Sequence, residues 1–302
     1  MPRIKLTIAY VGTGFAGWQV QAENQGVTQR TVQGELEAAL HDLLNGLKRR
    51  NDLDQPDCPG LPDQTTGLIR LHASGRTDSG VHADMQVAHF DAPAGCERIN
   101  WAQALHRRLP GDISILAAET VAEDFHARFD CRAKIYTYAL WLERAYVPPK
   151  LRPFAWACGP LNLEAMDKAA ALLIGRHDFA SFQNVGSKPG DTVRNLLSVE
   201  RFFAAMPGEA AVIPGEATIP READVIPSEA APQPDNPYVV WRFQGDGFLK
   251  QMVRNLTGFL VSVGQGKLEP DDAPRILAAR DRTAFDFPTA PAWGLTLSKV
   301  IY

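Results

Sequence analysis

The run Ser74-Gly-Arg-Thr-Asp-Ser-Gly-Val-His-Ala83 is the densest polar stretch of the chain. It lies between two segments, Leu68 to Ala73 and Met85 to Phe90, whose apolar residues favour β-strands. The sequence therefore predicts two strands joined by a polar loop. An arginine and an aspartate, Arg76 and Asp78, stand two residues apart in that loop.

Two glycines, Gly75 and Gly80, frame this loop and allow backbone conformations that other residues avoid. A loop on rigid strands can present Arg76 and Asp78 side by side for chemistry. The competing interpretation is an ordinary hairpin turn, because Asp-Ser-Gly is common turn chemistry. Local composition leaves both interpretations open.

Strand and helix patterns alternate along the rest of the chain. The first strand shows strict alternation, with Ile4, Leu6, Ile8 and Tyr10 on one face. Two successive series of strands and helices, with many adjacent strands, predict an α+β protein with largely antiparallel sheets. The predicted strands are 4–10, 68–73, 85–90, 113–121, 134–142, 192–203, 238–244 and 295–302, and the predicted helices are 31–50, 100–109, 162–174 and 249–263.

Composition places the chain among ordinary globular proteins, with 302 residues, 45% hydrophobic and 22% charged. This length suggests two domains. No apolar run approaches the ~18 residues of a membrane helix, and no signal peptide is evident, so we expect a cytoplasmic protein. The 4 cysteines are scattered, which argues against a zinc site or a disulfide framework.

The acidic charge is concentrated in one segment, residues 207–237. It holds seven prolines and a degenerate Pro-Gly-Glu-Ala repeat, and four Glu and two Asp against one Arg give it a charge of −5. The whole chain carries −4, so the remainder carries +1 and can still present a basic surface to RNA. We interpret this segment, and a polar loop at about 51–66, as surface insertions.

Several motifs, taken together, resemble one family. Gly75 to Ala83 resembles the active-site motif of the tRNA pseudouridine synthase A (TruA) family, which usually has Ala where this chain has Ser79. Each further match is short, but their joint order over nearly the whole chain is specific. They are Tyr10–Gln19, Thr31–Gln33 with Leu36 and Glu37, Gln86–Phe90, Leu109–Ile113, Phe125–Phe129, Tyr136–Tyr138, Gly175–Phe179, Gly247–Asn255 and Ala290–Leu295.

The resemblance implies two similar α/β domains, 1–125 and 126–302, that form a continuous, mainly antiparallel sheet with a central active-site cleft. It implies an isomerase that converts uridine to pseudouridine at nucleotides 38, 39 and 40 of the tRNA anticodon stem-loop, without metal or organic cofactor. The family is homodimeric, and tRNA lies across both subunits. Basic candidates for the cleft rim are Arg128, Arg132, Lys134, Lys188 and Arg194.

Three charged residues match family positions with roles in catalysis. Asp78 matches the catalytic aspartate, which acts as nucleophile or base. Arg254 matches the arginine that pairs with this aspartate, although an exposed charge on the 249–263 helix is the alternative. Arg76 matches an arginine that helps to displace the target base from the stem; a surface phosphate contact is the alternative.

Two apolar or aromatic residues match the substrate pocket. Tyr136 matches a tyrosine that stacks on the extruded uracil. Its place in a stripe with Tyr138 and Leu140 equally suits a core residue. Leu295 matches a pocket-lining position, with simple packing as its alternative.

Other functional classes receive less support. A catalytically silent RNA-binding protein on the same scaffold would not need Asp78, and an aspartate-dependent hydrolase would not need the other matched segments. A metal site built from His82, Asp84, His89 and Asp91 lacks a further ligand at a suitable spacing.

Overall fold

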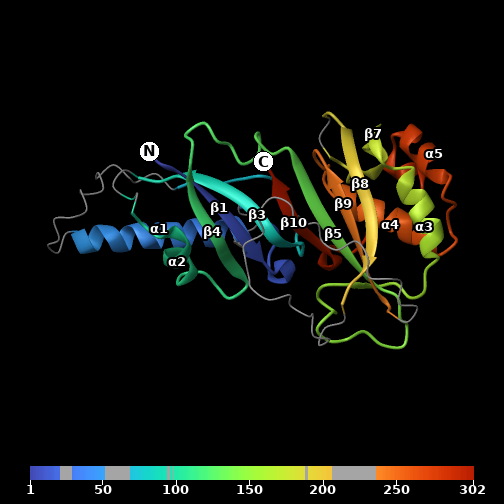
Figure 1. Cartoon of the computed structure of the whole chain (residues 1–302), viewed down its shortest axis with the longest axis horizontal. Coiled ribbons are helices and arrows are strands. Elements are labelled where there is room, and N and C mark those ends of the chain that lie inside the picture. Colours follow the sequence, from blue (N-terminus) through green and yellow to red (C-terminus); the bar gives the residue numbers. More distant parts are fainter. Residues whose placement is uncertain (21–28, 52–68, 94–95, 97, 188–189, 206–235) are drawn as a thin grey trace. The chain divides into compact units, whose positions relative to one another are not determined.

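The computed structural model describes residues 1–20, 29–51, 69–93, 96, 98–187, 190–205 and 236–302 (Figure 1). Nearly all of the two predicted insertions, at 51–66 and 207–237, lies outside these residues, as does Lys188. The strands are β1 Arg3–Tyr10, β2 His72–Ala73, β3 His82–Asp91, β4 Ile113–Val121, β5 Ala133–Trp141, β6 Trp156–Ala157, β7 Gly175–Asp178, β8 Val193–Phe203, β9 Tyr238–Gly245 and β10 Leu295–Ile301. The α-helices are α1 Val32–Asn51, α2 Trp101–His106, α3 Leu163–Ala171, α4 Met252–Gly264 and α5 Asp272–Ala279.

The strands form a ten-stranded sheet in the order β4-β1-β3-β10-β5-β9-β8-β7, with β2 paired to β3 and β6 paired to β5. Most described pairs are antiparallel, while β10 with β3 and β6 with β5 run parallel. The predicted α+β class with a mainly antiparallel sheet is confirmed. The sequence patterns did not reveal the order of the strands, which depends on pairing between distant segments.

The chain divides into two compact units: unit 1 is Met1–Ile135 with Thr296–Tyr302, and unit 2 is Tyr136–Leu295. The change from one to the other falls inside β5, and the last strand returns to unit 1. The division into domains at residues 125 and 126 remains a prediction.

Unit 1 is built around β1, whose residues alternate between half-buried and buried along its whole length. The predicted apolar face of β1, Ile4 to Tyr10, is buried. In the sheet β1 lies between β3 and β4, and α1 and α2 contact each other in the same unit (Figure 1). This packing fixes the end of β1 at Tyr10, next to the polar loop.

Unit 2 has a different kind of core. Here β8 pairs with β9 in antiparallel register, and α3 packs against both α4 and β8. Asn162 accepts a hydrogen bond from the backbone N–H of Ala165 and so begins α3 as its cap. Every residue of α4 except Arg254 is buried. None of the described helices combines the length and the apolar composition that crossing a membrane would need.

Candidate active site

The polar loop connects β2 to β3, as the sequence predicted, although β2 covers only His72–Ala73 of the predicted strand 68–73. His72 pairs with His89 and Ala73 with Ala88, and the backbone N–H of Ser74 donates to the Val87 carbonyl at 2.8 Å. The strand β3 begins at His82, three residues before the predicted start. The loop is therefore limited to the residues between Ser74 and Val81.

Buried polar side chains from the two neighbouring strands support this loop. Gln86 of β3 accepts from the Ser74 hydroxyl at 2.7 Å and donates to the Gly75 carbonyl at 3.0 Å. Tyr10, at the end of β1, shares a hydrogen bond of 2.8 Å with the Thr77 hydroxyl. All these groups are buried except the half-buried Gly75, and a buried polar network with satisfied partners rigidifies what it contacts.

Asp78 is half-buried in the middle of the loop, and Arg76 is exposed. The backbone on both sides of Asp78 is held. Ser79, which stands where the family motif usually has Ala, donates its hydroxyl to the Phe15 carbonyl at 3.1 Å. The N–H of Val81 donates to the Asp78 carbonyl at 3.2 Å. The bond between Val81 and Asp78 closes an ordinary β-turn, whereas the bonds of Thr77 and Ser79 to distant residues fix this turn in the fold.

In unit 2, Arg254 is half-buried on a helix whose other residues are all buried. Its Nε donates to the Ala290 carbonyl at 2.7 Å, and the Ala290 N–H donates back to the Arg254 carbonyl at 3.1 Å. The helix lies very close to this segment, since a methyl group at Gly258 would come within 1.7 Å of the Pro288 oxygen. Arg254 is thus a fixed group rather than an exposed charge on an amphipathic helix.

Tyr136 and Leu295 are both buried in unit 2. The Tyr136 ring meets Phe248 edge-on, with centroids 5.1 Å apart. Leu295 follows a turn whose Gly294 lies against the ring of Tyr138, where a methyl group would approach to 2.7 Å. Both positions are compatible with the packing interpretation, and their substrate contacts remain predictions.

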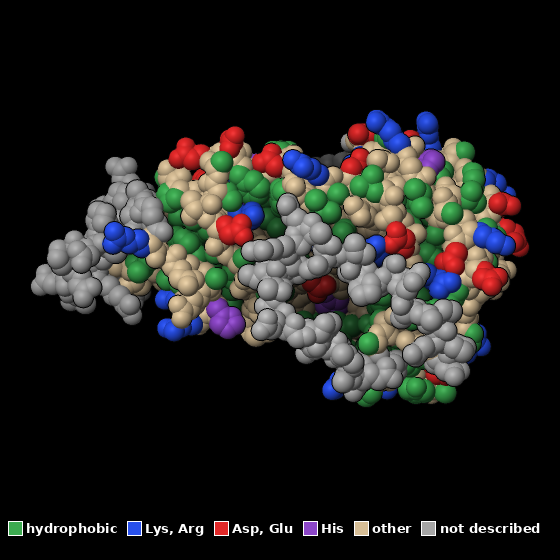
Figure 2. Space-filling model, in the orientation of Figure 1, with side chains coloured by type: hydrophobic (Ala, Val, Ile, Leu, Met, Phe, Trp, Pro, Cys, Tyr) green, Lys and Arg blue, Asp and Glu red, His purple; other side chains and the backbone are tan. Residues whose placement is uncertain are grey.

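The structure places the predicted residues in two groups: Arg76 and Asp78 in unit 1, and Tyr136, Arg254 and Leu295 in unit 2. Among the predicted basic residues, Arg128 and Arg132 are exposed, and Lys134 and Arg194 are half-buried. On the face drawn in Figure 2, cationic and anionic side chains are interspersed over the described residues.

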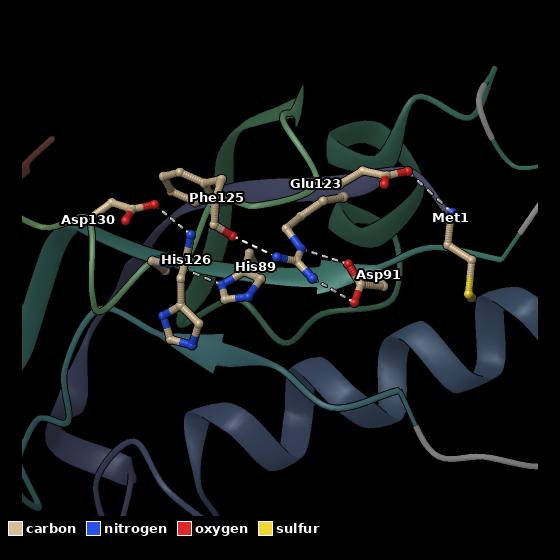
Figure 3. Close-up of polar contacts among 9 residues, drawn as sticks. Met1, His89, Asp91, Glu123, Phe125, His126 and Asp130 are labelled. Atoms are coloured by element: carbon tan, nitrogen blue, oxygen red, sulfur yellow. Dashed lines mark hydrogen bonds and ion pairs between the residues drawn. The ribbon is translucent and has the colours of Figure 1, made fainter.

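A second cluster of titratable groups, His72, His89 and His126, lies at the other end of β3, and Figure 3 shows two of its members, His89 and His126. The ring of His89 is 5.2 Å from that of His72 and 4.8 Å from that of His126, centroid to centroid. His89 is buried, and its Nδ1 accepts the N–H of Ala127 at 3.2 Å. Burial, together with the two neighbouring imidazoles, lowers the pKa of His89 to about 4.

Three of the four residues considered for a metal site, His82, His89 and Asp91, have other partners. His82 Nδ1 accepts the Gly12 N–H at 3.0 Å. Asp91 accepts two hydrogen bonds from Arg3, at 2.7 and 3.0 Å, which hold the pKa of its carboxyl below the usual value. Within the described ranges, no three His, Cys, Asp or Glu side chains gather in a way that would hold a metal ion.

Sequence reasoning missed the residues that support the loop, chiefly Tyr10 and Gln86. Both lie in segments that match the family, but their partners are distant in sequence and only pairing in the sheet brings them together. A glutamine inside the apolar run of β3 was the available signal, because a buried amide needs partners.

Comparison with known proteins identifies close relatives. A family model described as tRNA pseudouridine synthase matches residues 6–130 and 169–302. The chain is 48% identical over 302 residues to tRNA pseudouridine synthase A of Nitratidesulfovibrio vulgaris strain Miyazaki F, covering 100% of both chains. It is 41% identical to that of Lawsonia intracellularis, again over 100% of both, and 36% identical to that of Geobacillus kaustophilus, over 99% of this chain and 94% of the relative.

Proposed function

The chain belongs to the tRNA pseudouridine synthase A family and is an isomerase, and we propose that it converts uridine to pseudouridine at nucleotides 38, 39 and 40 of the tRNA anticodon stem-loop with Asp78 as the catalytic residue. The observation that carries the proposal is the support of the Asp78 loop. The neighbours Thr77 and Ser79 are hydrogen-bonded to distant segments, and Asp78 itself is half-buried in the loop. This combination suits a group that must meet a substrate in one orientation.

The reaction explains why a carboxylate is required. The N1–C1′ glycosidic bond breaks, the uracil turns, and C5 bonds to C1′; the C5 proton is lost and N1 gains one, so that the composition is unchanged. The Asp78 carboxylate either attacks C1′ to form a covalent adduct or removes the 2′ proton to give a glycal. Both routes use an ionised carboxylate and retain the base.

Arg254 is assigned to pair with Asp78 and orient it, since a guanidinium binds a carboxylate with two parallel hydrogen bonds. Its anchoring on the Ala290 carbonyl supports this role, because an arginine fixed at Nε has fewer orientations. The half-exposure of Arg254 in an otherwise buried helix also supports it.

Arg76, Tyr136 and Leu295 are assigned to the target nucleotide. The reacting atoms of a stacked base are inaccessible, so the nucleotide must leave the stem. Arg76 is exposed beside Asp78 and is assigned to the vacated position. Tyr136, whose ring packs at a steep angle against that of Phe248, is assigned to stack on the uracil, and Leu295 to line its pocket.

The substrate partner is tRNA, and we assign the active form to a homodimer by family analogy. The exposed Arg128 and Arg132 and the half-buried Lys134 and Arg194 are the described candidates for phosphate contacts.

The test is incubation of the purified protein with an unmodified tRNA transcript, followed by pseudouridine mapping. Transcripts in which uridine is replaced by cytidine at one of the three nucleotides identify the positions. We expect pseudouridine at 38, 39 or 40, and replacing the uridine at one of these nucleotides should remove the product at that nucleotide. Product at other nucleotides only, or product formed by Asp78→Asn at the wild-type rate, would overturn the proposal.

A further inference from the structure

The segment Gly12–Trp18 lies directly against the Asp78 loop. The Phe15 carbonyl accepts the hydroxyl of Ser79 at 3.1 Å and the backbone N–H of Gly80 at 3.3 Å. The Trp18 N–H donates to the Thr77 carbonyl at 3.1 Å. The residues before and after Asp78 are therefore both bound to this one segment.

The backbone of the segment leaves no room for displacement toward the loop. Gly17 has a φ of +106°, and a methyl group there would come within 2.8 Å of the Thr77 oxygen. A methyl group at Gly12 would come within 2.0 Å of the Val81 oxygen. Both glycines are needed for close approach, so a small movement of the segment would move the loop with it.

Arg30 fixes this segment to the rest of unit 1. Its Nη1 and Nη2 donate to the two carboxylate oxygens of Asp112 at 2.7 and 2.9 Å, and its Nε donates to Glu35 at 2.8 Å. The guanidinium lies 4.2 Å from the centre of the Phe15 ring. The Arg30 carbonyl also accepts the N–H of Ala16 at 2.8 Å.

These contacts join three elements at one side chain: Glu35 belongs to the first turn of α1, Asp112 precedes β4, and Phe15 contacts the loop. We propose that Arg30 is a positioning residue for Asp78 and acts through Phe15. The proposal rests on the assignment of Asp78 as the catalytic residue.

The partial exposure of Arg30 indicates that it contributes little to the free energy of unfolding, so a positioning role can be tested separately. Its side chain is 38% exposed and its two acidic partners are about equally accessible, at 32% for Glu35 and 31% for Asp112. Ion pairs at such sites contribute little to the free energy of unfolding. The planar guanidinium of Arg30 is nevertheless held in one orientation by two parallel hydrogen bonds and a ring contact, so it can fix the positions of the groups that it contacts.

The test compares Arg30→Met and Arg30→Lys with a matched control, Arg201→Met. Arg201 also donates two hydrogen bonds to one carboxylate, Asp167, at 2.8 and 2.7 Å, and lies 5.7 Å from the ring of Phe203. It belongs to β8 in unit 2 and has no place in the proposed chemistry. Each variant is measured for melting temperature, tRNA affinity and single-turnover rate at saturating tRNA.

For Arg30→Met we expect a rate reduced by about tenfold, since small displacements of a reacting group have large effects. The tRNA dissociation constant should stay within about twofold. Arg30→Lys should be intermediate, because lysine keeps the charge but not the fork. Arg201→Met should retain the wild-type rate even where its melting temperature falls.

Three outcomes would overturn the proposal: a wild-type rate in Arg30→Met, an equal loss of rate in Arg201→Met, or weaker tRNA binding with an unchanged rate, which would make Arg30 an RNA contact. If Arg30→Met does not fold, Arg30→Lys and Asp112→Asn decide by the same criteria. Failure of the proposed function is distinguishable, because it would show as absent or misplaced product with the wild-type enzyme.

Discussion

The two ends of β3 share one kind of hydrogen bond but lie in different surroundings. At each end a buried histidine accepts a backbone N–H with its Nδ1: His82 from Gly12, next to the Asp78 loop, and His89 from Ala127, next to a surface turn. The surroundings of the two rings differ. Besides His82, the side chains that support the loop are buried hydroxyl and amide groups, whereas around His89 lie two further imidazoles and the ion pair of Arg3 with Asp91.

Because of this difference, we expect pH to affect the two ends of β3 differently. Burial raises the pKa of the Tyr10 hydroxyl above its ordinary value, so the network below the loop stays neutral well into the alkaline range. At the other end, burial and neighbouring histidines lower the pKa values of His89 and His126. We therefore expect pH to act on stability through the cluster of His72, His89 and His126 and to leave the hydrogen bond between Tyr10 and Thr77 unchanged.

The largest effect is expected from Asp78→Asn at the loop end. An amide is close in shape but is neither a nucleophile nor a base at neutral pH, so the rate should fall by about a thousandfold or more. Asp84→Asn, the same change six residues away on β3, is the control and should stay near the wild-type rate. Residual turnover within about tenfold of wild type would remove Asp78 from the mechanism.

A smaller effect is expected from Tyr10→Phe, which removes the hydrogen bond to Thr77. The free energy of unfolding should fall by about 1 kcal/mol. The rate should also fall, but by less than the ~100-fold that a displacement of 1 Å costs. Tyr302→Phe is the control near the cluster of His72, His89 and His126, because the Tyr302 hydroxyl donates to the Ala127 carbonyl at 2.7 Å. It should lose similar stability and no rate; equal rates in both variants would contradict the comparison.

The cluster of His72, His89 and His126 should make the free energy of unfolding depend on pH. An unfolded histidine titrates near 6.5 and folded His89 at about 4, so between these values the unfolded chain binds more protons. The free energy of unfolding should therefore fall as the pH drops from about 6.5 to about 4, with no further loss from His89 below that.

His89→Asn tests this expectation, because an asparagine oxygen can still accept the Ala127 N–H. The fall in melting temperature over that pH interval should become shallower, though His126 keeps part of it. The exposed His41→Asn on α1 should retain the full fall. Identical pH profiles for His89→Asn and wild type would contradict the assignment.

The smallest effect is expected from a region outside both ends. We predict that replacing Pro207–Pro234 by a short Gly-containing turn leaves the saturated rate unchanged and holds or slightly raises the melting temperature. Around this segment β8 and β9 pair through Phe203 and Val239, and Ala204 and Tyr238 are hydrogen-bonded at 3.0 Å. A folded deletion variant that loses turnover would show that the segment positions the substrate.

Local patterns predicted the elements whose signal lies within a few residues. The alternation of β1, the strand β4, and the cap of α3 at Asn162 agree with the structure. The strand β3 was predicted too short, because His82 and Ala83 are placed in it by parallel pairing with Thr296 and Leu297. A contact between residues more than 200 positions apart leaves no periodic signal.

The same reason limits the prediction of the site. Asp78 and Arg76 could be identified from a resemblance in one loop, but the role of Arg30 depends on Phe15, Glu35 and Asp112, three separate elements. For Arg254, the sequence left open an exposed charge on the 249–263 helix, whereas every other residue of α4 is buried and α3 and the segment at Pro288 pack against this helix.

The parallel pairing of β10 with the start of β3 also has a consequence for synthesis on the ribosome. Residues 82 and 83 follow the Asp78 loop directly, and their partners, Thr296 and Leu297, are translated only after all of unit 2. Until then this stretch of β3 has one edge without its native partner, which is a site for mispairing in a nascent chain. The end of β3 next to the Asp78 loop can therefore reach its native pairing only after Thr296 and Leu297 have been translated.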